Sequence, residues 1–266
     1  MAAVSAEDWD RLETTRITLS IDRGNDGTIE EVVILQPGYV VFAGSQACEN
    51  TIDWPGSGST VSGHIHSNND INISGSNNTI TGLTEYVTSI KVSGSNNVYT
   101  PTQSSVLPLV VEYDVDDYKP GGVAAEAAQE EGRYHYISGD LKVWSSGEVL
   151  DGLYYVTGDV KLSGSVLSGE VTIVAEGQVK ASGSNQSFTA YSGDLLFFSQ
   201  RGYGSPEGCQ EEAINVPGSG MVWDGVVYAP HGLIKVSGSN SVLEGRLIGG
   251  AIKLSGSNLE IGFFVE

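Results

Sequence analysis

Basic residues and cysteines are both scarce in this chain. Its 13 lysines and arginines stand against 33 aspartates and glutamates in 266 residues, which gives a net charge of −20. Binding to nucleic acid or docking on anionic lipid requires a basic face, so this balance argues against both kinds of partner. A strongly acidic composition is typical of a soluble, secreted or surface-exposed protein.

The two cysteines, Cys48 and Cys209, lack the CxxC spacing of a zinc or thioredoxin-type site. They are either two separate free thiols or, in an oxidising compartment, one long-range disulfide. No apolar run reaches the roughly 18 residues of a membrane span. Residues 1–12 also lack the basic start and apolar stretch of a signal peptide. We expect no membrane span, and if the protein is exported, its signal or anchor is not in this sequence.

A short motif recurs along the chain. SGSN begins at Ser74, Ser93, Ser182, Ser237 and Ser255, and SGSV begins at Ser163. An apolar–polar–apolar triplet such as IKV or VKL precedes each copy, and LKV at 141–143 is a degenerate one. Alternation with a period of two predicts a strand with two side chains inward and one outward.

The SGSN and SGSV segments are predicted to be turns. Gly accepts positive φ, and Asn tolerates the left-handed region better than other non-glycine residues. The turn residues are Gly75, Asn77, Gly94, Asn96, Gly164, Gly183, Asn185, Gly238, Asn240, Gly256 and Asn258.

Several copies are separated by 18 or 19 residues, as in 74 to 93 and 237 to 255. One such period is too short to bury its own apolar face, whereas stacked periods pair in parallel and share one core. The sequence therefore predicts an all-β, single-stranded, right-handed parallel β-helix. We place it at 48–266, after an N-terminal region at 1–47.

Three segments interrupt the period. Residues 14–21 and 29–35 flank DRGNDG and predict a β-hairpin that caps the first core layer. Residues 112–132 predict an excursion with a short Ala- and Glu-rich helix, and residues 200–216 predict a second excursion. The apolar end of the chain, residues 261–266, would leave an open coil edge that invites end-to-end stacking.

Six of the seven lysines occupy the outward position before a turn, so stacked coils would place them in one or two rows. They are Lys91, Lys142, Lys161, Lys180, Lys235 and Lys253. One interpretation is a soluble face whose charge is compensated by nearby acids. The other is a cationic stripe that holds anionic glycans or a partner subunit.

Candidates for chemistry are few. His64 and His66 lie on one face of a predicted strand and could ligate a metal. However, the repeat aligns His66 with Tyr155 and Tyr228, which favours a column of stacked rings. Asp114, Asp116 and Asp117 form either a solvated loop or a calcium site. No GxSxG nucleophile motif is present. We expect no enzymatic activity and no cofactor, with a polysaccharide lyase or hydrolase as a minor alternative.

The longest motifs resemble a known family. The segments 63–82, 154–185 and 223–258 look like the β-solenoid ectodomains of bacterial pilus-assembly proteins related to the TadE/TadG and PilX groups. The resemblance covers about residues 48–266. It implies an exported, pilus- or surface-associated protein without known catalysis, with pilus or surface-filament subunits as partners. Bactofilins, which are β-helical polymers, are similar at the level of the repeated strands.

Together these observations predict a non-enzymatic extracellular structural or adhesive β-solenoid. A self-assembling filament subunit is one alternative. A carbohydrate-active enzyme or a glycan-binding module is the other.

Overall fold

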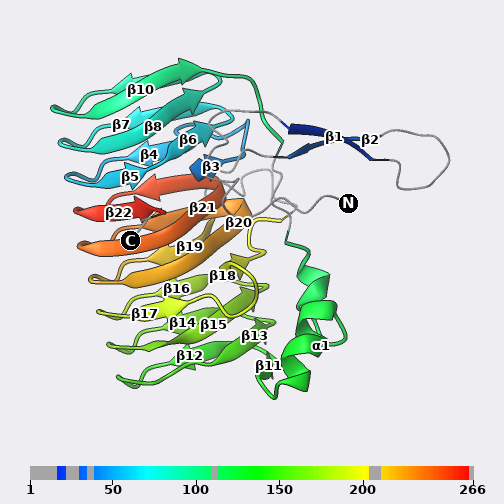
Figure 1. The fold of residues 1–266 in the computed structure, drawn as a ribbon. Helices are drawn as coiled ribbons and strands as arrows, with labels where there is room; N and C mark the ends of the chain where they lie inside the picture. The colour runs from blue at the N-terminus through cyan, green and yellow to red at the C-terminus, as the bar shows by residue number, and fades with distance from the viewer. Residues whose placement is uncertain (1–16, 22–29, 35–38, 109–112, 204–210, 264–266) are drawn as a thin grey trace.

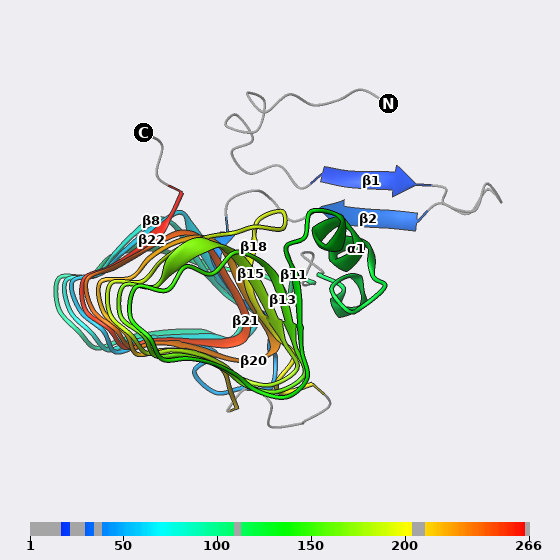
Figure 2. The same cartoon turned by 90° about the horizontal axis from the view of Figure 1, so that it is seen from below.

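The computed structural model of the chain describes residues 17–21, 30–34, 39–108, 113–203 and 211–263. Nearly all of it is one stack of parallel β-strands, seen from the side in Figure 1 and along the stack in Figure 2. Each turn of chain pairs with the turns above and below it. The predicted parallel β-helix is confirmed.

Two segments of chain build the stack. The first segment contains β3 (Tyr39–Ala43), β4 (Ile52–Trp54), β5 (Thr60–Ser62), β6 (His64–Ser67), β7 (Asp70–Ile73), β8 (Thr79–Tyr86), β9 (Ser89–Val92) and β10 (Val98–Gln103). The second segment contains β11 (Tyr134–Ile137), β12 (Leu141–Val143), β13 (Gly152–Val156), β14 (Val160–Leu162), β15 (Ser168–Ala175), β16 (Val179–Ala181), β17 (Ser187–Thr189), β18 (Leu195–Ser199), β19 (Glu212–Val216), β20 (Val222–Val236), β21 (Ser241–Leu254) and β22 (Leu259–Gly262). The solenoid thus begins at Tyr39, before the boundary expected at residue 48.

The coils are not stacked in the order of the sequence. The first segment begins at mid-height and rises to β10 at the upper end of Figure 1, whereas the second begins at β11 and β12 at the lower end and rises to β22. The two segments meet at a junction where β21 pairs with β3 and β4, and β22 pairs with β5. The last coil of the chain therefore lies directly beneath the first.

This junction corrects two predictions. The strand β22 is paired on both sides, with β21 and with β5, so it is not the open edge expected at the end of the chain. The first coil is covered by β21 and β22 and needs no cap from the N-terminal hairpin. Because the chain doubles back, the open edges of the stack lie elsewhere, at β9 and β10 above and at β11 and β12 below.

The hairpin itself is confirmed. The strands β1 (Ile17–Ile21) and β2 (Glu30–Ile34) pair antiparallel, with Ile17 opposite Ile34. Both views place this small sheet beside the stack rather than on either end of it (Figures 1 and 2). Its loop lies outside the described residues.

A crossover, residues 104–133, joins the top of the stack to the bottom. It contains the 3-10 helix η2 (Val115–Asp117) and the helix α1 (Val123–Glu130), and Figure 1 shows α1 beside the lower coils. The predicted Ala- and Glu-rich helix is confirmed. However, the segment expected to be a local excursion is instead the connection that returns the chain from the upper end of the stack to the lower end, from which the second segment rises to meet the first. The second predicted excursion, 200–216, ends early, because β19 already begins at Glu212.

The stack has two apolar layers. Residues that alternate inward, such as Ile65, Val227 and Ile252, form one continuous core inside the coils. A second cluster, which includes Phe42, Tyr155 and Tyr228, lies on the outer face of one side and packs against the crossover. The buried Ala128 of α1 belongs to this cluster. The crossover therefore covers apolar surface that the strands leave outside.

Candidate functional site

The predicted lysine row exists and is a single column. From the lower end to the upper end it runs Lys142, Lys161, Lys180, Asn215, Lys235, Lys253, Asp53, Asn72 and Lys91. It crosses the junction without a change of register, since Lys253 of the last coil pairs with Asp53 of the first. The sequence indicated the lysines but not the order in which the coils place them.

Acidic groups neutralise much of this column. The Nζ atom of Lys253 lies 2.6 Å from Asp53 Oδ2, and that of Lys235 lies 2.6 Å from Glu212 Oε1. Lys142 lies 3.0 Å from an oxygen of Asp140. The hydrogen bond from Lys235 lowers the pKa of Glu212 despite its partial burial. These contacts favour the interpretation of a compensated face over that of a cationic stripe.

The repeated turns have the expected conformation at Asn but not at Gly. Asn77, Asn96, Asn185, Asn240 and Asn258 all have φ between 54° and 59°. In contrast, the SGSN and SGSV glycines lie outside the positive-φ region. A Cβ atom on Gly75, for example, would collide with the carbonyl oxygen of Gly56 in the coil below. These glycines are needed because successive turns approach too closely for any side chain.

The turns stack in a column from coil to coil, and the PGSG segments at Pro55 and Pro217 belong to this column. There Gly58 and Gly220 take the left-handed position that Asn takes elsewhere, with φ of 69° and 67°. PGSG is therefore a variant of the SGSN turn, a relation that the sequence comparison missed. In the lowest coil the position of the first turn glycine is occupied by Ser145, which lies beneath Gly164.

His66 lies in the predicted column with Tyr155 and Tyr228. That column also contains Phe42, whose ring stacks on His66 with centroids 5.2 Å apart. The ring of His66 is fully buried. No cluster of three or more His, Cys, Asp or Glu side chains suited to a metal occurs within the described residues. Val174 and Ile248 also occupy positions in this column, so the predicted column of stacked rings is interrupted. At its upper part the ring of His66 packs on that of Phe42, as the ring-column interpretation expects.

His66 belongs to a buried polar network. Its Nδ1 lies 3.1 Å from Glu85 Oε2, which also accepts a 2.5 Å hydrogen bond from the Tyr39 hydroxyl. Its Nε2 lies 2.9 Å from Asn68 Oδ1. Burial would raise the pKa of Glu85, but the hydrogen bonds from His66 and Tyr39 outweigh it and lower that pKa. Both ring nitrogens therefore lie within hydrogen-bond distance of side-chain oxygens.

Asn68 connects this network to the crossover. Its Nδ2 donates to the carbonyls of Gly44 and Leu107, and its Oδ1 accepts from the Leu107 amide at 2.8 Å. Leu107 lies where the chain leaves the upper coils. The histidine that the sequence offered as a metal ligand thus helps to fasten the crossover.

The three predicted calcium ligands have separate structural roles. Asp114 caps η2 by accepting a 2.9 Å hydrogen bond from the Asp116 amide. Asp116 pairs with Lys119 at 2.6 Å. Asp117 lies inside η2 itself. Carboxylates used in this way do not converge on one point, so the solvated-loop interpretation is favoured.

Cys48 lies between β3 and β4 and is disulfide-bonded. Cys209 lies outside the described residues, so its pairing with Cys48 stays a prediction. A disulfide at this place would be anchored in the coil that forms the upper side of the junction.

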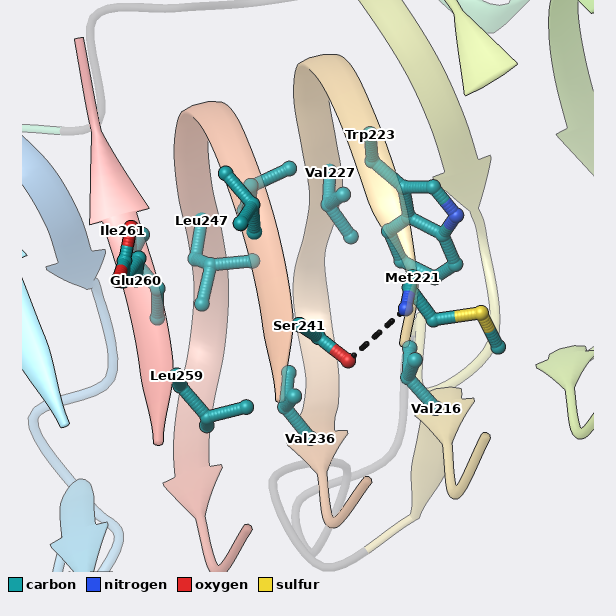
Figure 3. Close-up of a pocket in the computed structure, with 12 residues that line it drawn as sticks. Val216, Met221, Trp223, Val227, Val236, Ser241, Leu247, Leu259, Glu260 and Ile261 are labelled. Atoms are coloured by element: carbon teal, nitrogen blue, oxygen red, sulfur yellow. Dashed lines mark hydrogen bonds between the residues drawn. The ribbon is translucent and has the colours of Figure 1, made fainter. Parts of the chain in front are cut away.

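A small cavity in the inner core is shown in Figure 3. It has a volume of about 20 Å³ and lies among Met221, Trp223, Val227 and Leu259. Met221 donates a backbone hydrogen bond to Ser241 Oγ beside it. This volume suits about one water molecule and is far too small for a ligand. The cavity is a packing defect of the core.

A much larger hollow lies outside the coils. It has a volume of about 780 Å³ and opens between the crossover and the outer face of β18 and β20. We call it the aromatic cleft and define it by the rings of Tyr113, Phe198, Tyr203, Tyr228 and His231 together with Asp114. One sequence signal points to it, aromatic residues at outward strand positions, but no signal indicates the crossover that completes it.

No protein-family model, curated protein or solved structure matches this chain. Within the described residues, no helix has the length and apolar character needed to cross a membrane. The geometry of the solenoid is therefore the main basis for a functional proposal.

Proposed function

We propose that this protein is a non-enzymatic structural or adhesive module of the bacterial cell surface that displays a rigid solenoid rod. The observation that carries the proposal is the continuous inner core, which runs through both segments and across their junction. An uninterrupted core makes each coil depend on its neighbours and gives an extended, stiff surface. The resemblance of the repeats to pilus-associated ectodomains supports the same role.

The path of the chain also suits display. The first segment starts, and the second segment ends, at mid-height (Figure 1). Anything joined through these points would hold the rod by its side and leave both ends free. Pilus or surface-filament subunits are the partners that this role suggests.

The filament alternative rests on the open edges at the two ends, but both carry features that oppose stacking. At the upper end Pro101 lies in the edge strand β10. Ser104 donates its amide inward to Tyr86, so Pro101, three residues earlier, faces outward where a new strand would need a donor. At the lower end Ser145 places a Cβ where every higher coil has glycine. We therefore favour a discrete rod.

The experiment that tests the proposal is protease treatment of intact cells of the source organism, followed by detection of this protein. We expect cleavage without cell lysis, as for a surface protein, while a cytoplasmic marker stays intact. Protection equal to that of the marker would contradict the proposal. Incubation with polyuronates and neutral polysaccharides tests the enzyme alternative, and released product would overturn the non-enzymatic role.

A further inference from the structure

The aromatic cleft has the form of a ligand site. Its floor is made by Phe198 and Tyr228, which are buried and pack edge-to-face with centroids 5.0 Å apart. Tyr113 of the crossover closes one wall and packs on Tyr228 at 5.1 Å. The volume of about 780 Å³ falls within the range of small-molecule sites, roughly 300–1,000 Å³.

Two rings at the rim of the cleft contact each other. Tyr203 is 76% exposed, and its ring packs edge-to-face on His231 with centroids 4.8 Å apart. Exposed apolar surface beside a hollow can mark a ligand-binding groove. A ligand that covered both rings would remove apolar area from water.

Polar groups complement these rings. Asp114 and Gln200 line the same hollow, and each can hydrogen-bond to hydroxyl groups. Partial burial lowers the pKa of His231, so its imidazole is neutral at pH 7 and has one donor and one acceptor. Ring faces that meet C–H groups, surrounded by donors and acceptors for hydroxyls, are what a sugar requires.

The charge around the cleft favours a neutral sugar over an anionic one. The chain carries a net charge of −20, and the nearby Arg201 lies within 4 Å of carboxylates of Asp159 and Glu211. A polyanionic glycan would meet repulsion here. A purely apolar ligand would make no hydrogen bond to the Gln200 amide or to the exposed carboxylate of Asp114, which already accepts one from the Asp116 amide.

We propose that the aromatic cleft binds a neutral oligosaccharide. This inference rests on the proposed adhesive role, to which it gives a ligand class. It differs from the sequence-based expectation of anionic glycans on the lysine column in both the place and the charge of the ligand. Tyr203 and His231 would stack on the sugar rings, and Asp114 and Gln200 would bind hydroxyl groups.

The test is calorimetric titration of the full chain with two neutral probes, cellohexaose and chitohexaose, and one anionic probe, tetragalacturonate. We expect binding of at least one neutral probe and none of the anionic one. Tyr203→Ala and His231→Ala should each weaken binding at least tenfold. The matched control is Trp144→Ala, which removes another exposed ring at the lower end of the rod. Melting curves of all variants check that they are folded.

The site would be overturned if neither neutral probe bound, or if tetragalacturonate bound more tightly than both. It would also be overturned if Tyr203→Ala and His231→Ala bound the probe as tightly as the unsubstituted chain. The same holds if Trp144→Ala lost as much affinity as those two variants. Chromatography of the probes after incubation separates this inference from the proposed function. Binding with cleavage would refute the non-enzymatic role but keep the cleft as the site. Absence of binding would refute the cleft and leave the surface location to the protease experiment.

Discussion

The junction and the two ends of the rod expose similar coil edges, but the edges at the junction are paired with another coil and those at the ends are not. At the junction Gly56 stacks on Gly256, and Asp53 pairs with Lys253, although about 200 residues of chain separate them. At the ends the equivalent columns finish with Ser145 below and with Lys91 above. Stacking of coils therefore depends on a few column positions and not on continuity of the chain.

The largest expected effect comes from blocking the junction. Gly56→Ala would place a Cβ against the carbonyl oxygen of Gly256, which cannot move without shifting a whole coil. We expect a loss of about 3 kcal/mol in the free energy of unfolding, the upper range for overpacking. Urea unfolding measures it. Gly147→Ala at the lower end, where nothing lies within 4 Å, is the control for added Cβ, although its positive φ adds some strain. Equal losses in the two variants would contradict a special role of the junction.

The next effect concerns the upper coils, where Glu85 follows His66, the last ring of the outer column, and lies below Thr102. Glu85→Gln would leave His66 buried without its anionic partner, at a cost of about 2 kcal/mol at pH 7. The lowered pKa of Glu85 sets the sign of the pH dependence. Its stabilisation is complete above its ordinary value of 4.5 and is lost as pH falls through the lower value of the folded state.

Urea unfolding at about pH 6 and about pH 3 tests this dependence. We expect the difference between the chain and Glu85→Gln to shrink at the lower pH. Hydrogen exchange should show the upper coils opening first on acidification. A difference that stays constant with pH would contradict a charged role for Glu85.

A smaller effect is expected for the charge at the junction. Asp53→Ala removes the partner of Lys253 and the 3.0 Å acceptor of Asn72. Because the lysine is partly exposed and screened by water, we expect a loss of about 1 kcal/mol or less. Asp140→Ala, which removes the partner of Lys142 at the lower end, should cost still less. Melting at low and high salt measures both, and a larger loss for Asp140→Ala would reverse the comparison.

The smallest effect on stability is expected from removing the features that oppose stacking at the two ends. This change is also the sharpest test of the difference between the ends and the junction. Ser145→Gly with Pro101→Thr should change the free energy of unfolding by less than about 0.5 kcal/mol. However, it removes both obstacles to head-to-tail stacking, so light scattering should show mass that rises with concentration. Ser145→Ala with Pro101→Thr keeps the Cβ and should stay monomeric. A monomeric glycine variant would show that other features terminate the rod.

The repeated unit of this fold and its internal register can be predicted from the amino-acid sequence. The IKV-SGSN alternation fixes a strand and a turn, because side chains of a strand alternate between faces and Asn accepts the left-handed position. It therefore predicted the parallel β-helix, the left-handed asparagines and the column that contains His66, Tyr155 and Tyr228. The Ala- and Glu-rich composition of the excursion separately predicted the helix found at Val123–Glu130. These are local or nearest-neighbour properties.

The order of the coils, in contrast, follows from contacts between segments that are distant in the sequence. Each coil presents nearly the same edges to its neighbours. Asp53 has Lys253, from a distant part of the chain, below it and Asn72, from the next coil of the sequence, above it. Local sequence therefore cannot tell which coil follows which. The crossover resolves this choice by connecting the upper end to the lower one and covering the outer apolar face. For the same reason the sequence could not reveal the aromatic cleft, whose walls come from residues about 85 positions or more apart, such as Tyr113 and Phe198.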